Sequence, residues 1–442
     1  MKIFIVGAGA VGSYLAERLS YEGQDVVMIE SDPTRAAAAQ AEIDCLVVNG
    51  NGASVETLKR AGLKDADLLI AVSSSDAVNV LACAAGTKLN VPRKVARVED
   101  PQLKAEVEAL GVDLVIDPDE AAARELLRLA ESGGIAESIE FAGGELVLLG
   151  AHVDAGAKFI GHTLAELRDM VTGWDWLVVA TIKHGLTTIA RGSTVIHARD
   201  HVLIMAHRNG IAEAYEWLEL SSAPAEKAMV LGATRLARLT SQLLADSGIH
   251  TTLIDGDAAR CRAMAEAVPD VVTVCGDITD PKVLISEGVA SADTVMALSG
   301  WDGENVLGAL ASKALGAKES IARFSRTELV SLVTGEGIDA AVSSRMSAAN
   351  EILRFVRRGV IHSVVTFADS DAEAIELEIG PDSDAIGKTV AQLHLPHSMI
   401  IGGVQRGETA VVPRGDTAIE AGDHLIVITL PETIGLAEKL SG

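Results

Sequence analysis

Short apolar runs alternate with alanine-rich stretches of helical periodicity at the beginning of the chain. Each run has the length of a buried strand, and none reaches the length that spans a membrane. Strands are predicted at Ile3–Val6, Val26–Ile29, Leu46–Val48, Leu68–Val72, Val95–Val98 and Leu114–Ile116. Helices are predicted at Val11–Tyr21, Pro33–Ala41, Ser54–Ala61, Asp76–Leu89 and Gln102–Leu110. This alternation predicts an α/β fold with a Rossmann-like, doubly wound parallel sheet.

The pattern changes from about Glu140 to Arg208. Apolar and polar residues alternate there in short runs, such as Trp176–Lys183 and His201–Ala206, with glycine-containing turns between the runs. Alternation of this kind is typical of half-buried strands. It predicts a small α+β module, and an equivalent module is predicted from Glu373 to Leu430.

The chain carries one unit twice. The segment Val55–Asp76 returns 226 residues later as Pro281–Asp302. Residues kept at this offset include Leu58/Leu284, Gly62/Gly288, Ala66/Ala292, Asp67/Asp293, Asp76/Asp302 and Asn79/Asn305. Other segments of both halves repeat at the same offset, so the duplication spans the chain. We expect Rossmann-like domains at residues 1–134 and 222–360 and α+β domains at residues 135–221 and 361–442.

Two stretches of helical pattern, Ala121–Ala130 and Ile352–Arg358, correspond to each other in the two halves. We expect both to be long helices that link lobes or subunits. The second stretch carries the basic cluster Arg354, Arg357 and Arg358. This cluster fits a helix end whose cations complement the helix dipole, and contact with a membrane subunit or lipid is the alternative.

Composition restricts the class of protein. The 442 residues carry a formal net charge of −25, which makes nucleic acid an unfavourable ligand because cationic side chains supply most of that affinity. Met1 and Lys2 lead directly into a predicted strand without an apolar leader, so we expect a cytoplasmic protein. The cysteines have no CxxC spacing and lie in apolar stretches, which predicts buried, reduced thiols without disulfides or a metal site. They are Cys45, Cys83, Cys261 and Cys275.

The first predicted strand runs into the motif Gly7-Ala8-Gly9-Ala10-Val11-Gly12, in which a helix begins. The first glycine permits a sharp turn, the second lets backbone N–H groups approach a pyrophosphate, and the third lets the helix pack closely on the strand. Glu30 ends the second strand, where this fold presents an acid to a ribose 2′-hydroxyl. Its charge would repel a 2′-phosphate, so the motif favours NAD(H) over NADP(H). The alternative is that the glycines serve packing alone and Glu30 is a solvated acid.

Further candidate contacts follow the later strands of the same sheet. Candidates for the adenosine and ribose are Asn51, Gly52, Ser73 and Ser74. Ordinary turn residues with a helix cap at Asp76 are the alternative. Arg97 ends the fifth strand, and we expect it to reach a phosphate or to pair with Asp100.

The second half departs from the glycine motif. It has Gly232-Ala233-Thr234-Arg235-Leu236-Ala237 at the equivalent place, so two of the three glycines are missing. Thr234 puts a β-carbon where the backbone would meet a pyrophosphate, although Asp255 keeps the position of the ribose acid. Arg235 could instead meet the phosphate of a mononucleotide. We favour a second site that is structural only.

The sequence resembles the TrkA family of Trk potassium-uptake regulators, which are built from tandem RCK (or KTN) domains. The resemblance covers essentially the whole chain. Its carriers are Met1–Gly12, Asp67–Asn79, the arginines Arg97 and Arg323, and the Gly161–Leu164 segment that opens the small module. Within it, Gly7, Gly9, Gly12 and Glu30 match the nucleotide site of the family.

This resemblance implies a nucleotide-responsive regulator. Members form a ring, usually a tetramer, on the cytoplasmic face of a potassium-translocating membrane subunit, and they bind NAD(H), ATP or ADP. Nucleotide binding would shift the angle between lobes and so act on the pore.

The rival class is an NAD-dependent oxidoreductase with a duplicated Rossmann domain, because one fold serves many functions. Such an enzyme needs a positioned acid, base or metal beside the nicotinamide. The sequence offers no convincing set of this kind. We therefore expect a regulator with no catalytic residues and no metal ligands.

Overall fold

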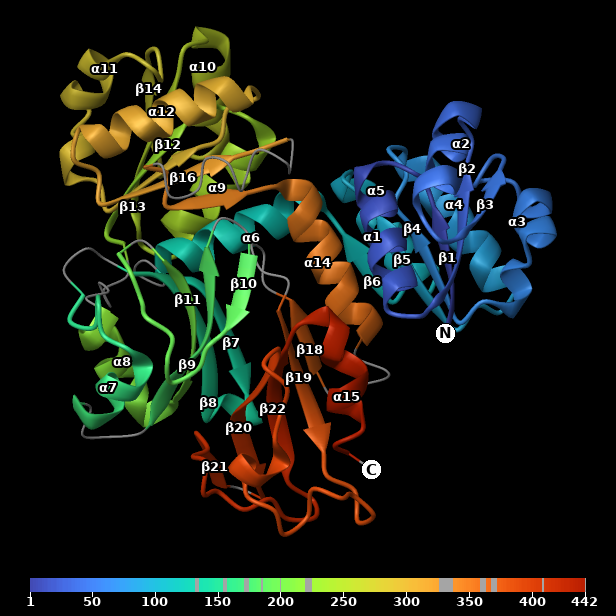
Figure 1. Cartoon of the computed structure of the whole chain (residues 1–442). Coiled ribbons are helices and arrows are strands. Elements are labelled where there is room, and N and C mark those ends of the chain that lie inside the picture. Colours follow the sequence, from blue (N-terminus) through green and yellow to red (C-terminus); the bar gives the residue numbers. More distant parts are fainter. Residues whose placement is uncertain are drawn as a thin grey trace. The chain divides into compact units, whose positions relative to one another are not determined.

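The described residues form four β-sheets, two of them parallel and two antiparallel (Figure 1). The computed structural model describes residues 1–131, 135–153, 157–170, 175–183, 186–198, 200–218, 225–325, 337–357, 363–366, 372–407 and 409–441. The chain divides into two units, Met1–Ala123 with Ser343–Val356 and Arg124–Val342 with Arg357–Gly442. Among the described residues, no helix is both long and apolar enough to cross a membrane.

The first sheet has six parallel strands in the order β3-β2-β1-β4-β5-β6. Its strands are β1 (Lys2–Val6), β2 (Asp25–Glu30), β3 (Leu46–Asn49), β4 (Leu68–Ala71), β5 (Arg93–Arg97) and β6 (Leu114–Ile116). Its helices are α1 (Ala10–Tyr21), α2 (Pro33–Glu42), α3 (Val55–Ala61), α4 (Asp76–Lys88) and α5 (Pro101–Ala109). The predicted Rossmann-like sheet is confirmed, and the predicted ends differ by at most two residues.

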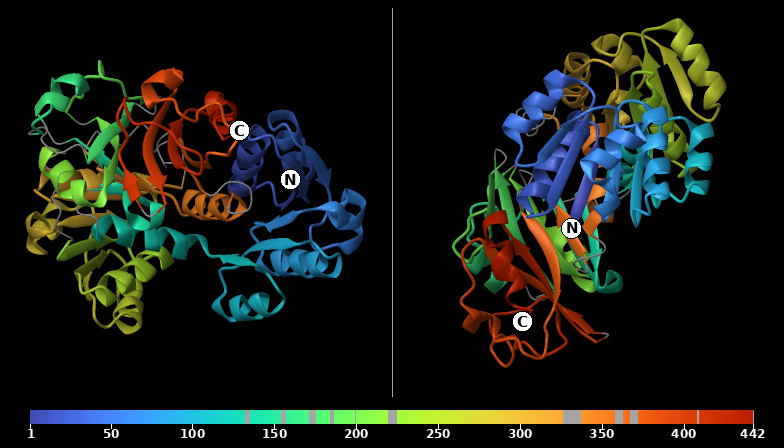
Figure 2. Two further views of the ribbon diagram at one scale, coloured as in Figure 1. Left: turned by 90° about the horizontal axis from the view of Figure 1, so that it is seen from below. Right: turned by 90° about the vertical axis from the view of Figure 1, so that its right-hand side faces the viewer.

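Both faces of this sheet are buried at its centre, which explains why the central strands β1 and β4 are almost continuously apolar. Ile3 and Ile5 of β1 pack on one face together with Leu15 of α1. Phe4 and Val6 pack on the opposite face, because successive side chains of a strand point to opposite sides. Figure 2 shows the blue strands of this sheet side by side between helices.

The second parallel sheet repeats the first, in the order β14-β13-β12-β15-β16-β17. Its strands are β12 (Lys227–Leu231), β13 (His250–Asp255), β14 (Val272–Cys275), β15 (Thr294–Ala297), β16 (Glu319–Arg323) and β17 (Ala340–Val342). Its helices are α9 (Arg235–Asp246), α10 (Ala258–Ala267), α11 (Pro281–Ser286) and α12 (Asp302–Ala314). The internal repeat seen in the sequence therefore corresponds to a repeated fold.

Each half also contains a five-stranded antiparallel sheet, as the alternating pattern predicted. The first comprises β7 (Ile135–Phe141), β8 (Leu146–His152), β9 (Trp176–Lys183), β10 (Leu186–Ile189) and β11 (His201–His207), with helices α7 (Leu164–Met170) and α8 (Ile211–Leu218). The second comprises β18 (Ser363–Thr366), β19 (Glu373–Glu378), β20 (Met399–Arg406), β21 (Thr409–Val411) and β22 (His424–Thr429), with helix α15 (Ile434–Glu438). Leu146 and Val179 of the first sheet share one apolar cluster with Ile426 and Ile428 of the second.

The two predicted long helices are α6 (Pro118–Glu131) and α14 (Ser344–Arg357). Although α14 follows a strand of the second sheet, its apolar face packs in the first unit (Figure 1). Ile352 and Leu353 belong to the same buried cluster as Ile3 and Leu15. A helix from the second half thus completes the core of the first parallel sheet. Arg358 of the predicted basic cluster lies outside the described residues.

The three predicted domain boundaries fall at 134/135, 221/222 and 360/361. Residues 132–134, 219–224 and 358–362 lie outside the described residues, so the domain limits stay predictions.

Candidate nucleotide site

The motif glycines lie at the switch point of the first sheet, where the chain leaves β1 and the neighbouring strand is β4. In open α/β sheets, ligands bind in the crevice at such a point, outside the carboxyl ends of the strands. Gly7 has φ +108°, and a Cβ at this residue would lie 2.9 Å from Cα of Ser73. Only glycine satisfies both the left-handed backbone and this close approach.

Gly12 lets α1 pass directly against the turn. A Cβ on Gly12 would lie 1.9 Å from the carbonyl oxygen of Gly7, a distance that no side chain tolerates. Next to it, Val11 is buried in the core and Ala10 is exposed. Gly12 is therefore required for packing between helix and strand.

Gly9 differs from the other two glycines. Its φ of −78° and ψ of −179° suit any residue, and a Cβ there would meet nothing within 4 Å. As the N-cap of α1 it has no side chain of its own that could cover the N–H groups of the first turn. These donors and the positive end of the helix dipole form a natural site for an anion.

Glu30 is buried at the end of β2, only 7% exposed. Its Oε2 accepts a hydrogen bond from the Ala8 N–H at 2.7 Å, and its Oε1 accepts from the Asp32 N–H at 2.8 Å and the Ser31 hydroxyl at 3.2 Å. Burial alone would raise the pKa of Glu30, but the hydrogen bonds outweigh it and the pKa lies below the ordinary value. A carboxylate accepts about four hydrogen bonds, so the ionised group retains capacity on Oε2.

The candidates after β3 have local partners. Asn51 accepts a hydrogen bond from the Ala53 N–H at 2.9 Å. A Cβ on Gly52 would lie 2.2 Å from Cγ1 of Val6, so glycine is needed there for packing. Asn49, at the end of β3, donates to the carbonyl oxygen of Glu30 at 2.9 Å and fixes the end of β2.

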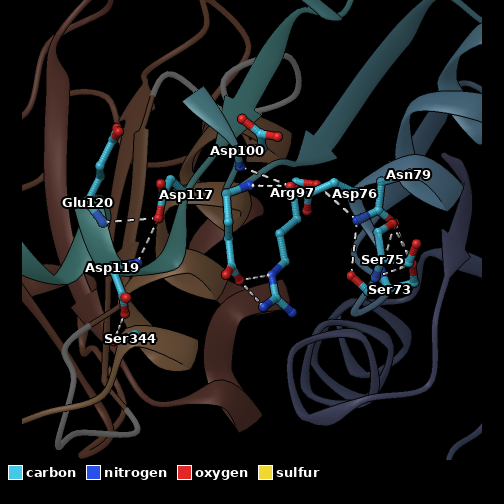
Figure 3. Close-up of polar contacts among 11 residues, drawn as sticks. Ser73, Ser75, Asp76, Asn79, Arg97, Asp100, Asp117, Asp119, Glu120 and Ser344 are labelled. Atoms are coloured by element: carbon cyan, nitrogen blue, oxygen red, sulfur yellow. Dashed lines mark hydrogen bonds and ion pairs between the residues drawn. The ribbon is translucent and has the colours of Figure 1, made fainter. Parts of the chain in front are cut away.

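Asn79 organises the edge beyond β4, and the sequence analysis recorded it only as a repeated residue. Its Oδ1 accepts from the N–H of Ser73 at 2.9 Å and from the Ser73 hydroxyl at 2.8 Å, and its Nδ2 donates to the carbonyl oxygen of Arg97 at 2.9 Å (Figure 3). The fully buried amide thus ties the ends of β4 and β5 together. Ser74 is exposed beside this tie. Its repetition as Asn305 in the second half was the sequence signal that could have indicated this structural role.

Arg97 pairs with Glu99, and its Nε lies 3.0 Å from Oε1 of that residue. The expected pairing with Asp100 is wrong, because the backbone turns there and the Asp100 N–H donates to Asp76 at 2.9 Å (Figure 3). The alternative of a helix cap at Asp76 is also wrong. Ser75 caps α4, which leaves the Asp76 carboxylate free to bind the loop after β5.

In the second sheet, the side chain of Thr234 fills the place that Gly9 leaves open. Its hydroxyl donates to the carbonyl oxygen of Leu298 at 2.8 Å and accepts from the Ala237 N–H at 3.2 Å. The first contact bridges the switch point, and the second caps α9. A first-turn donor that a phosphate would use is already paired with the chain itself.

Asp255 repeats the backbone contacts of Glu30, with the N–H groups of Ala233 at 2.7 Å and Asp257 at 2.8 Å. It differs in its third partner. This partner is Arg260, whose Nε and one outer guanidinium nitrogen each lie 3.0 Å from Oδ1 of Asp255. The acid of the second half is thus held in an ion pair.

Family models match both halves of the chain. The TrkA-N domain model matches residues 3–118 and 228–344, and the TrkA-C domain model matches residues 148–219 and 374–442. These matches follow the parallel and the antiparallel sheets respectively.

Relatives match over nearly the full length. The Trk system potassium uptake protein TrkA of Haemophilus influenzae is 30% identical, with 97% of this chain and 95% of the relative covered. The TrkA homolog of Archaeoglobus fulgidus is 32% identical, with both chains covered completely. Among solved structures, the GsuK channel bound to NAD shares the fold with a TM-score of 0.62 at 20% identity, over 98% of this chain and 78% of that one.

Proposed function

The chain belongs to the TrkA family, and from this premise we propose that it is the nucleotide-binding regulatory subunit of a Trk-type potassium uptake system. Proteins of this family are regulators and not enzymes, which sets the oxidoreductase alternative aside. The proposal concerns which nucleotide binds, where it binds and what the binding controls.

The first half supplies the nucleotide site, and NAD(H) is the proposed ligand. The pyrophosphate lies at the start of α1, where the lack of a side chain on Gly9 admits it. A ribose hydroxyl donates to Glu30, whose charge disfavours the 2′-phosphate of NADP(H). The remaining proposed contacts are Ala8, Asn51, Gly52, Ser73, Ser74 and Arg97. The GsuK channel, which shares the fold, has a structure with NAD bound and supports this choice.

One difference between the halves carries the proposal. Gly9 leaves the helix terminus accessible, whereas Thr234 occupies the equivalent place with its own hydrogen bonds. The second half therefore serves as a structural partner without a bound dinucleotide, and Asp255 has a structural task. ATP and ADP share the adenosine and phosphate chemistry of NAD(H), so they compete for the first site.

The proposed assembly is a homo-oligomeric ring on a potassium-translocating membrane subunit, at the cytoplasmic face. Leu81 on α4 and Leu307 on α12 are the same position of the repeat, and their side chains are 53% and 60% exposed. Trp301, at the start of α12, is 74% exposed. Large apolar side chains exposed at equivalent places of both halves are typical of surfaces that bury one another on association.

Nucleotide binding would act on the membrane subunit as a population shift. A ligand favours whichever arrangement of lobes it binds more tightly, and it shifts the equilibrium by that difference in affinity. The loops after β1, β2 and β4 would close on NAD(H), and the ring would pass the change on to the pore.

Potassium flux into vesicles that contain the membrane subunit tests this function. Flux should depend on added full-length protein and should change with NADH. The Gly9→Asp variant should still bind the membrane subunit but lose the response to NADH. A response that survives in Gly9→Asp, or flux that ignores the protein, would refute the proposal. ATP and ADP are assayed in parallel to rank the effectors.

A further inference from the structure

Two of the cysteines meet at the carboxyl end of the second parallel sheet. Cys275 ends β14, and Cys261 lies in the first turn of α10. Sγ of Cys261 lies 3.1 Å from the carbonyl oxygen of Asp255 and 3.6 Å from that of Val274, the residue before Cys275. Sγ of Cys275 lies 3.9 Å from the carbonyl oxygen of Gly256, the residue after Asp255, so both thiols lie against the turn that follows β13.

The two thiols differ in access. Cys261 is buried, whereas Cys275 is exposed, so the expectation of buried cysteines is wrong for Cys275. Its exposure follows from its place at the last residue of β14, an outer strand of the sheet. A small reagent can therefore reach one thiol directly and the other only through the first.

The shared fold does not require this pair. The first half has Ala36 and Asn49 at the places of Cys261 and Cys275. The equivalence is fixed by register, because Asn49 pairs with Glu30 as Cys275 pairs with Asp255. Asp32 and Asp257 cap α2 and α10 in the same way, which places Ala36 where Cys261 lies. The same sheet edge thus forms without either sulfur atom.

We propose that Cys261 and Cys275 form a modification site that reacts with low-molecular-weight disulfides and closes to an intrachain disulfide. The Cys275 thiolate attacks one sulfur of the reagent, whose S–S bond breaks and releases one small thiol. Cys261 then loses its proton and attacks the Cys275 sulfur of the mixed disulfide, which expels the second small thiol. Two protein thiols are oxidised by two electrons, and the reagent is reduced to two thiols.

The closing step is slow near neutral pH. Burial, together with the neighbouring Cys275 thiol and Asp255 carboxylate, raises the pKa of the Cys261 thiol to about 11. Only the thiolate attacks, so closure accelerates as the pH rises towards that value. In a cytosolic setting the glutathione pool would keep the resting pair reduced, and the disulfide would be transient.

The disulfide would act on the second nucleotide position. It would join the first turn of α10, which carries Arg260, to the end of β14, where Cys275 pairs with Asp255 in the sheet. The tether would hold this edge closed while leaving the first half unchanged. The inference is independent of NAD(H) binding at Gly9.

Oxidised glutathione is the probe, applied to the full-length protein with alkylation of the remaining thiols and peptide mass mapping. Wild type should form the Cys261–Cys275 disulfide, which dithiothreitol reverses, with a rate that rises with pH. Cys261→Ala should stop at one glutathione on Cys275, and Cys275→Asn should leave Cys261 unmodified. Both variants carry the residues of the first half, so they preserve the fold.

Two results would overturn the inference. One is a wild-type protein that stops at a glutathione adduct or does not react at Cys275. The other is modification of Cys261 in the Cys275→Asn variant. NADH affinity, measured on oxidised and reduced protein, should be the same in both, so failure of this site is distinguishable from failure of the first.

Discussion

The glycines of the first half differ in what a methyl group would meet. A Cβ on Gly12 would lie 1.9 Å from the carbonyl oxygen of Gly7, whereas a Cβ on Gly9 would meet nothing within 4 Å. Gly12→Ala should lower the free energy of unfolding by roughly 1–3 kcal/mol, the usual cost of overpacking. Gly9→Ala should leave it nearly unchanged. Urea unfolding followed by circular dichroism measures both, and equal stability of the two variants would contradict these assignments.

Glu319 of β16 gives the second sheet a pH-dependent stability. Burial raises the pKa of its carboxyl to about 7, and the nearby Asp339 carboxylate also raises it, whereas Lys313 lowers it. A raised pKa favours the protonated folded state. The stabilisation is therefore complete below the ordinary pKa of 4.5 and is lost as the pH rises through about 7.

Replacing the Glu319 carboxyl with an amide tests the direction of this pH dependence. The melting temperature of Glu319→Gln should exceed that of wild type increasingly as the pH rises through about 7, because the amide stays neutral. Thermal unfolding across this range measures the difference. A constant difference at every pH would contradict the buried, protonated carboxyl.

The sequence analysis found residues that act within one short segment, and it missed residues whose partners lie far away in the chain. The glycine motif and Glu30 were identified because strand, turn and helix follow one another directly. The tie made by Asn79 reaches a carbonyl 18 residues away, and the bridge made by Thr234 reaches one 64 residues away. Arg97 pairs with Glu99 and not with Asp100 because of the conformation of the turn after β5. Residue patterns fix none of these contacts.

The helices and strands of the first parallel sheet were predicted to within two residues, since hydrophobic periodicity reports which face is buried. Periodicity does not report what covers that face. The apolar side of α14 was visible in the sequence, but its packing beside Ile3 and Leu15 of the other half was not. That contact depends on the route of the chain after β17.

The placement of α14 predicts which sheet a mutation loosens. Leu353→Ala should cost roughly 2–5 kcal/mol, as for other buried leucines, and should speed hydrogen exchange in β1 and β4. Leu236→Ala, the matched change in α9, should speed exchange in β12 and β15 instead. Mass spectrometry of exchanged peptides separates the two sheets. Faster exchange of β12 and β15 in Leu353→Ala would contradict the observed packing.

At the scale of the whole molecule, duplication has kept the framework and changed one site. Gly62 and Gly288 follow α3 and α11 in the same left-handed conformation, and Asn79 and Asn305 make the same ties between strands. The position at which we propose that the ligand binds differs, with Gly9 in one half and Thr234 in the other. A repeated fold with one accessible helix terminus suits a regulator that binds a nucleotide without consuming it.

Assembly can be tested on the repeated exposed leucines. Light scattering should find wild type as an oligomer, and Leu307→Asp should lower its mass because a charge cannot be buried in an apolar interface without a partner. Leu186→Asp, on an exposed residue of β10, serves as the control and should change nothing. If the double variant Leu81→Asp/Leu307→Asp kept the mass of wild type, these leucines would not lie in the interface.

Calorimetric titration with NADH tests the central claim, that the first half alone holds the dinucleotide. Aspartate suits the backbone at Gly9 and caps a helix well, so Gly9→Asp should fold normally while its carboxylate repels the pyrophosphate. Thr234→Asp makes the matched change in the second half. We expect one NADH per chain for wild type and Thr234→Asp and none for Gly9→Asp. Undiminished binding to Gly9→Asp, or equal loss in both variants, would contradict the account.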